Sequence, residues 1–170
     1  NLFWTGGYDS TARLCQIVIE LKKPVQPLYI DFNLDNQSYD QFWVRKNRKQ
    51  EKKAMKKIIN NIIKKYPYTK KLINPVKFIT HKTDDPNFIN KFNKINLFPK
   101  KRRIHQYLYL SQYAYLLKDY IEIGVLGIHK NSKFAEFLQY NLVDEGENYH
   151  IRGDNALKYI KFPLYNQSKE

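Results

Sequence analysis

Short apolar runs alternate along the chain with stretches whose hydrophobic residues recur at helical spacing. Four of these runs predict buried strands, at residues 2–4, 25–32, 76–80 and 121–128. Pro27 weakens the first half of the second strand, because proline cannot donate a hydrogen bond to a sheet. Three helices are predicted between the runs, over residues 12–21, 42–66 and 103–117. Lys22-Lys23-Pro24 is expected to end the first helix, and Tyr66-Pro67 the second.

The remaining segments have weaker patterns. Residues 81–101 show no clean period and are predicted to form an irregular loop, of a length that often covers a site. Ser132 is predicted to cap a short helix that extends to Leu138. From Asp144 onward the sequence indicates a turn, an ambiguous amphipathic piece and a segment at Phe162-Pro163-Leu164.

This order of elements predicts an α/β fold. Regular alternation of strands and helices favours a three-layer, Rossmann-like sandwich, with helices on both faces of a mostly parallel sheet of about five strands. The chain of 170 residues fits a single domain, 1–170. Ligands of such sheets bind at the carboxyl ends of the strands. That rule places four segments along one rim: residues 5–10, 31–36, 80–85 and 127–131.

Composition narrows the class of protein. The single cysteine, Cys15, excludes an internal disulfide framework and a multi-cysteine zinc site within these residues. No run approaches the roughly 20 apolar residues of a membrane span, and no signal peptide is evident, so a cytoplasmic location is expected. The net charge of +14 has two interpretations: a polyanionic partner, or the Lys- and Asn-rich composition that A/T-rich coding produces. The charge alone does not identify a partner.

The sharpest chemical signal is the segment Thr5-Gly6-Gly7-Tyr8-Asp9-Ser10, between the first predicted strand and the first predicted helix. Adjacent glycines allow backbone conformations that bring N–H groups close to a ligand, and the helix N-terminus adds partial positive charge. The hydroxyls of Thr5, Ser10 and Thr11 add donors without charge. The segment therefore predicts a phosphate or pyrophosphate site. It lacks the Gly-Lys-Ser/Thr ending of a Walker A loop and the glycine spacing of the dinucleotide fingerprint.

Asp9 is unusual in a loop that binds anions, and two roles are open. It could cap the N-terminus of the following helix, or help to hold a Mg²⁺ ion that offsets the charge of a triphosphate. No other metal ligands are predicted, because the four histidines share no ligand spacing with one another or with carboxylates.

Thr5 to Ser10 resembles the Ser-Gly-Gly-x-Asp-Ser signature of the PP-loop ATP pyrophosphatases (adenine nucleotide alpha-hydrolase-like proteins), with Thr in place of the first Ser. The wider stretch Leu2 to Leu14 is similar to the opening of 7-cyano-7-deazaguanine synthase-like proteins of queuosine biosynthesis. Three later stretches resemble the same proteins in the same order: Glu51 to Met55, Arg103 to Ala114, and Phe162-Pro163-Leu164 with Ser168-Lys169.

The resemblance implies a ligase that cleaves ATP to AMP and pyrophosphate and adenylates a carboxylate or carbonyl, with ATP and Mg²⁺ required. It implies catalytic roles for Asp9 and Ser10, and weaker substrate contacts from Arg103 and Gln106. The positions that it implies for ATP binding are Thr5, Gly6, Gly7, Tyr8, Asp9, Ser10, Thr11, Asp31, Phe32 and Lys169.

Structural roles compete with three of these assignments. Asp31 could instead cap a turn, and Lys169 could belong to a disordered terminus. Arg103 at the start of a helix opposes the helix dipole, so it requires either an anionic substrate or a neighbouring carboxylate such as Asp84 or Asp85.

The chain also departs from the family, which typically carries a cysteine cluster for zinc in its C-terminal part. The chain begins without Met and stops where the resemblance expects another helix, which indicates a fragment or a divergent relative without zinc. Three functions stay open: a small-molecule ligase, a tRNA-modifying PP-loop enzyme and a non-catalytic nucleotide-binding module. The expected partners are ATP and a small carboxylate, without a membrane; nucleic acid is not favoured, and a homodimer is an open alternative.

Overall fold

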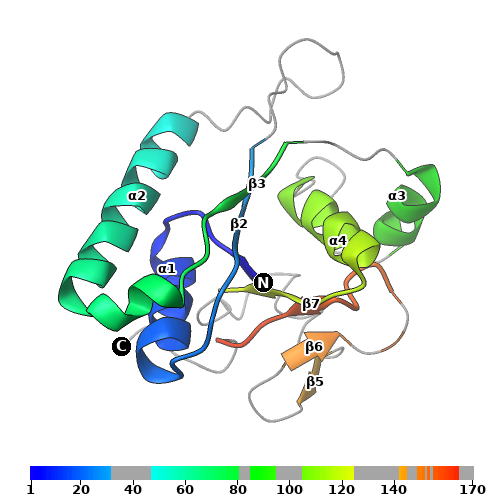
Figure 1. Cartoon of the computed structure of the whole chain (residues 1–170). Helices are drawn as coiled ribbons and strands as arrows, with labels where there is room; N and C mark the ends of the chain where they lie inside the picture. The colour runs from blue at the N-terminus through cyan, green and yellow to red at the C-terminus, as the bar shows by residue number, and fades with distance from the viewer. Residues whose placement is uncertain are drawn as a thin grey trace. The chain divides into compact units, whose positions relative to one another are not determined.

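The computed structural model describes residues 1–31, 47–80, 85–94, 105–124, 142–144, 149–151, 153 and 155–164 (Figure 1). The chain divides into two compact units, unit 1 at Asn1–His81 and unit 2 at Lys82–Glu170, which are considered in turn. It is an α/β protein whose seven described strands make both parallel and antiparallel pairs.

Unit 1 contains three parallel strands in the order β3-β2-β1. These are β1 (Leu2–Phe3), β2 (Pro27–Ile30) and β3 (Lys77–Ile79), and each lies within a predicted strand. Leu2 pairs with Pro27, and Tyr29 pairs with Phe78. Pro27 is the first residue of strand β2. At this position its missing N–H does not interrupt the hydrogen bonds of the rest of the strand.

Two helices of unit 1 confirm two of the predicted helices over the described residues. Helix α1 (Tyr8–Cys15) continues into a π-helical turn, η1 (Gln16–Glu20), and ends before Lys22, which has a positive φ of 50°. Helix α2 (Arg48–Lys65) ends at Tyr66, and Pro67 begins the short 3₁₀ helix η2 (Pro67–Lys71). Residues 42–46 of the predicted second helix lie outside the described residues.

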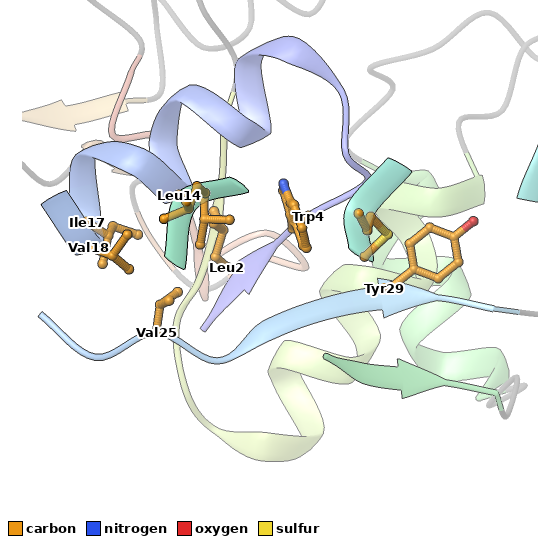
Figure 2. Packing of buried hydrophobic residues seen from close by; sticks show 9 residues of the cluster. Leu2, Trp4, Leu14, Ile17, Val18, Val25 and Tyr29 are labelled. Atoms are coloured by element: carbon orange, nitrogen blue, oxygen red, sulfur yellow. The ribbon is translucent and has the colours of Figure 1, made fainter. Parts of the chain in front are cut away.

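The core of unit 1 lies between the strands and both helices (Figure 2). Its buried members are Leu2, Trp4, Leu14, Ile17, Val18, Val25, Tyr29, Met55 and Ile62. Because α1 and α2 both contribute to this one cluster, they cover the same face of β1 and β2. Cys15 packs partly buried against the cluster, and this burial, followed by the charge of Glu20, raises the pKa of its thiol.

Unit 2 contains a helix in a segment that was predicted as an irregular loop, and that prediction was wrong for residues 86–93. Helix α3 (Pro86–Asn93) begins after Asp85, whose carboxylate accepts a hydrogen bond from the Asn87 amide at 2.9 Å. Pro86 occupies the first helical position, where its missing N–H breaks no helical bond. Phe88 is its buried side chain, and the helix has only eight residues, too few for the sequence to show several helical repeats.

Four short strands complete unit 2, in the order β4-β7-β6-β5. They are β4 (Ile121–Ile123), β5 (Leu142–Asp144), β6 (Tyr149–Ile151) and β7 (Ile160–Lys161). Strand β4 confirms part of the fourth predicted strand and pairs in parallel with β7, whereas β6 pairs antiparallel with both β5 and β7. The prediction of about five strands was therefore too low, and it missed the antiparallel hairpin of β5 and β6.

Helix α4 (His105–Leu117) confirms the third predicted helix. Its Leu110 and Ala114 side chains are buried, whereas Leu117 at its end is exposed. Ser111 and Gln112 are buried in addition. Gln112 is 2% exposed, and neither atom of its side-chain amide has a hydrogen-bond partner within the described parts of the chain.

Replacing Gln112 by leucine is expected to raise the free energy of unfolding by about 1–2 kcal/mol, because it removes two buried polar atoms that have lost their hydration. Urea unfolding followed by circular dichroism measures the change. Ser111→Ala is the matched control and should be nearly neutral, since the Ser111 hydroxyl is already bonded to the Tyr107 carbonyl. A loss of stability in Gln112→Leu would contradict the prediction and reveal a partner for the amide.

Candidate functional site: the loop between β1 and α1

The loop from Thr5 to Ser10 joins strand β1 to helix α1, as the sequence predicts. Gly6 has a φ of +74°, which favours glycine, and Gly7 is the extended N-cap of α1. A Cβ atom on Gly6 would lie 3.0 Å from Met55 Cγ, so a larger residue would force the Met55 side chain to shift. Glycine at position 6 is thus favoured by both the backbone conformation and the neighbouring helix.

The hydroxyls of Thr5 and Ser10 brace the loop from within. The Ser10 hydroxyl donates to the Gly7 carbonyl at 3.2 Å and accepts from the Thr5 amide at 3.4 Å. The Gly7 amide donates to Thr5 Oγ1 at 3.4 Å. At these lengths the bonds are weak, so the hydroxyls shape the loop without locking it. Ser10 is buried, whereas Gly7 and the Tyr8 side chain are exposed.

The N-terminus of α1 faces this loop. The first bond of its helical ladder runs from the Thr11 amide to the Gly7 carbonyl at 3.0 Å. The amides of Tyr8, Asp9 and Ser10 precede that bond, so the helical ladder provides no acceptor for them. Asp9 lies in the first turn of α1, and the N-cap is Gly7. The interpretation of Asp9 as the N-cap is therefore wrong, although its charge still complements the helix dipole.

Trp4 fixes the first turn of α1 to the end of β1. Its indole nitrogen donates to Thr11 Oγ1 at 3.1 Å, and Figure 2 shows this nitrogen on the α1 side of the ring. The ring itself is fully buried in the core of unit 1. The bond occupies one lone pair of the Thr11 hydroxyl and leaves its hydrogen able to point elsewhere.

Asp31 directly follows β2 and makes ion pairs with two cations in the first turns of α2. Lys52 Nζ donates to its Oδ2 at 2.5 Å, and Arg48 Nε lies 3.0 Å from Oδ1 at an angle that makes no hydrogen bond. The Asp31 side chain is 13% exposed. Its described partners are thus cations, and the three side chains together carry one net positive charge.

The same end of α2 meets β2 and β3 through aromatic side chains. The Tyr29 hydroxyl donates to Glu51 Oε2 at 2.5 Å. Lys52 Nζ lies 4.9 Å from the centre of the exposed Phe78 ring, which contacts Tyr29 edge-on at 5.9 Å. The first turns of α2 therefore form a partly charged, partly aromatic wall beside the ends of β2 and β3.

Several predicted site residues fall outside this geometry. Phe32, Arg103 and Lys169 lie outside the described residues, as does the side chain of Gln106, whose backbone belongs to α4. The structure brings Gly6 together with Met55, and Asp31 together with Lys52. No site role was predicted for Arg48, Lys52 or Phe78. The four-residue spacing of Arg48 and Lys52 places both on one helical face, but it does not reveal that Asp31 lies opposite them.

A hollow of about 460 Å³ lies at the other end of α2, lined by Pro67, Tyr68, Lys70 and Lys71, and it shares no residue with the loop. Among the described residues, no group of three acidic, histidine or cysteine side chains is placed to bind a metal ion. None of the described helices combines the length and apolar character needed to cross a membrane. Comparison of the chain with protein-family models, curated proteins and solved structures gives no significant match.

Proposed function

We propose that the protein is an ATP-dependent ligase that cleaves ATP between its α- and β-phosphates and adenylates a substrate carboxylate. The observation that carries this proposal is the loop from Thr5 to Ser10, with Gly6 in a left-handed conformation and Gly7 capping α1. A glycine pair between a buried strand and a helix N-terminus suits a pyrophosphate group. The matching Ser-Gly-Gly-x-Asp-Ser-like sequence makes the PP-loop chemistry the best-supported choice.

In the proposed reaction a carboxylate oxygen attacks the α-phosphorus, and pyrophosphate leaves. Ammonia or another nucleophile then displaces AMP. The amides of Tyr8, Asp9 and Ser10 and the α1 dipole would stabilise negative charge on the leaving pyrophosphate. The hydroxyls of Thr5 and Ser10 would exchange their weak internal bonds for stronger bonds to anionic phosphate oxygens.

In this proposal Asp9 would hold a Mg²⁺ ion at the loop. Magnesium is commonly held by one or two carboxylates together with the phosphates of its nucleotide. Asp31 suits that role less well, because Lys52 and Arg48 already neutralise it. The ion would offset charge on the triphosphate, and Asp9 would orient it relative to the loop.

The end of β2 is proposed to contact the adenosine. The ion pair of Asp31 with Lys52 would hold α2 in place, and the exposed Phe78 ring offers a surface for the base. Phe32, Lys169, Arg103 and Gln106 keep the ATP and substrate roles implied by the family resemblance, as part of this proposal. A Rossmann-like three-layer arrangement belongs to it too, supported by the parallel order β3-β2-β1.

The decisive assay incubates the protein with Mg-ATP, ammonia and candidate carboxylates, a deazaguanine carboxylate first. Release of AMP and pyrophosphate supports the proposal, whereas ADP and phosphate would refute it. A rise in melting temperature with ATP but no pyrophosphate would indicate a nucleotide-binding module without catalysis.

Asp9→Asn and Ser10→Ala are each expected to slow pyrophosphate release at least tenfold, equivalent to about 1.4 kcal/mol of activation free energy. Asp9→Asn removes the charge for the metal ion, and Ser10→Ala removes both the loop brace and a phosphate donor. Initial rates at saturating ATP measure the effect. Asp119→Asn is the matched control, because asparagine can still accept the hydrogen bond from the Tyr120 amide. Unchanged rates in both loop variants would remove the proposed site.

A further inference from the structure

A continuous series of aromatic rings runs across unit 2. It joins α3, α4, β6 and the residues that precede β4 and β7. The successive ring centroids are 5.4, 5.9, 5.8 and 6.5 Å apart along Phe88, Tyr115, Tyr159, Tyr120 and His150. These rings and the lysines beside them are called the tyrosine–lysine face below.

The strand register explains why two of these tyrosines meet. Ile121 of β4 pairs with Ile160 of β7 in parallel, and Tyr120 and Tyr159 immediately precede that pair. The Ile121 amide donates to the Tyr159 carbonyl at 2.9 Å and fixes the two backbones together. Tyr115 lies five residues before Tyr120, in the last turn of α4. The register of β4 with β7 thus places Tyr159 beside Tyr115 and Tyr120, which come from a distant part of the sequence.

Three lysines lie over these rings. Lys91 Nζ is 5.2 Å from the centre of Tyr115, and Lys161 Nζ is 4.1 Å from that of Tyr120. Lys158 lies between two rings, 5.9 Å from Tyr115 and 5.0 Å from Tyr159. The acidic residues on the same elements are Asp119, which accepts from the Tyr120 amide, and Glu122, which is paired in register with Lys161.

The face is open at its two outer tyrosines. Tyr115 is 37% exposed and Tyr120 is 40% exposed, and Leu116 beside them is also exposed. Tyr159 and all three lysines are half-buried. A bound partner would therefore gain by covering the exposed parts of Tyr115 and Tyr120.

We propose that the tyrosine–lysine face binds single-stranded nucleic acid. Rings spaced along a surface and interleaved with cations match the two features that such strands require: platforms for bases and positive charge for phosphates. Base stacking on an aromatic ring is a stronger contact than an exposed cation–π contact. A base can therefore stack on a ring in place of the cation–π contact, while the positive charge of the lysines stays close to the phosphates. This inference is independent of the proposed ATP chemistry.

A single strand is favoured over a duplex because duplex bases are already stacked and cannot reach the rings. It is favoured over an acidic peptide because a peptide supplies the negative charge but few flat groups to stack. The alternative basic surface is the exposed side of α2, with Lys49, Lys53, Lys56, Lys57 and Lys64. That side carries charge without clustered aromatic rings, so it would bind single and double strands alike.

The test uses fluorescence anisotropy of the full chain with a labelled single-stranded RNA of mixed sequence, and with the same RNA as a duplex. Tyr115→Leu/Tyr120→Leu is expected to weaken single-strand binding at least tenfold, whereas Tyr115→Phe/Tyr120→Phe should stay within twofold because phenylalanine keeps the stacking surface. Tyr68→Leu, at a tyrosine of unit 1 that is 39% exposed, is the matched control. Circular dichroism checks that each variant is folded.

Salt dependence tests the lysines separately. For single strands the plot of log affinity against log salt concentration has a negative slope. The magnitude of this slope decreases by about 0.7 for each phosphate that the protein no longer neutralises. Lys158→Gln/Lys161→Gln should therefore reduce the slope by about 1.4, with the tyrosines intact. The proposal is overturned if the leucine variant binds like the wild type, if the duplex binds as tightly as the single strand, or if only Lys53→Gln/Lys57→Gln in α2 reduces affinity.

Discussion

Gly6→Ala is expected to lower the free energy of unfolding by about 2–5 kcal/mol, which sums two costs. A non-glycine residue in the left-handed region costs about 1–2 kcal/mol, and Gly6 has a φ of +74°. Crowding a packed interior costs about 1–3 kcal/mol, and the new Cβ would lie 3.0 Å from the buried Met55 side chain. Urea unfolding measures the sum.

Gly153→Ala separates the two costs. Gly153 has nearly the same φ, +79°, but a Cβ there would meet no atom within 4 Å. Its substitution should therefore show the backbone cost alone. If Gly6→Ala costs no more than Gly153→Ala, then α2 does not press against the loop as the structure indicates.

Met55→Ala provides the complementary test, because it opens the space that the new methyl group would enter. In that background the cost of Gly6→Ala should fall to the value at Gly153, which a double-mutant cycle detects as a coupling energy. On the proposed function, Gly6→Ala should also abolish the rise in melting temperature with Mg-ATP, since the loop amides would move. Gly153→Ala should retain that rise.

The first half of the fold could be predicted because its elements carry strong local signals. Helix α2 has 18 residues, and its apolar residues recur at helical spacing. Strand β2 is buried along its whole length. In the second half, helix α4 and part of β4 were predicted. Strands β5, β6 and β7 were not, since they have two or three residues each, too few to show alternation. Their pairing depends on register between distant segments, such as Val143 with His150. Only α3 had a usable signal that was missed, the Asp85-Pro86 start.

The loop itself could be predicted for the same reason: glycines between a strand and a helix are a local feature. The contacts that surround the loop could not be predicted. The contact between Gly6 and Met55 and the ion pair of Asp31 with Lys52 join residues that are far apart in the sequence. Asp31 was correctly placed at the end of a strand, but a sequence does not reveal which cation will reach it. The position of a carboxylate was predictable, and its charge partner was not.

Trp4→Ala is expected to cause the largest loss of stability, about 3–5 kcal/mol, because it empties the space of a fully buried ring in the core of unit 1. That loss is a large part of the 5–15 kcal/mol that typically separates folded from unfolded domains. Trp4→Phe should cost less, since it keeps most of the packing and removes the N–H bond to Thr11. Equilibrium unfolding of both variants measures the difference, and a cost below about 1 kcal/mol for Trp4→Ala would contradict the packing described.

Thr11→Val distinguishes the hydrogen bond from the packing. It should cost about 1–3 kcal/mol, because the indole N–H of Trp4 then stays buried without an acceptor. In the double variant Trp4→Phe/Thr11→Val neither partner is left unsatisfied, so its cost should be smaller than the sum of the single costs. Additive costs would mean that the bond does not hold α1 to β1. Because Trp4 immediately precedes Thr5 and Thr11 lies in α1 just after Ser10, this one bond connects both ends of the loop from Thr5 to Ser10 to the core. On the proposed function, a loosened Trp4 should therefore lower ATP affinity as well as stability, although the tryptophan itself has no proposed contact with the nucleotide.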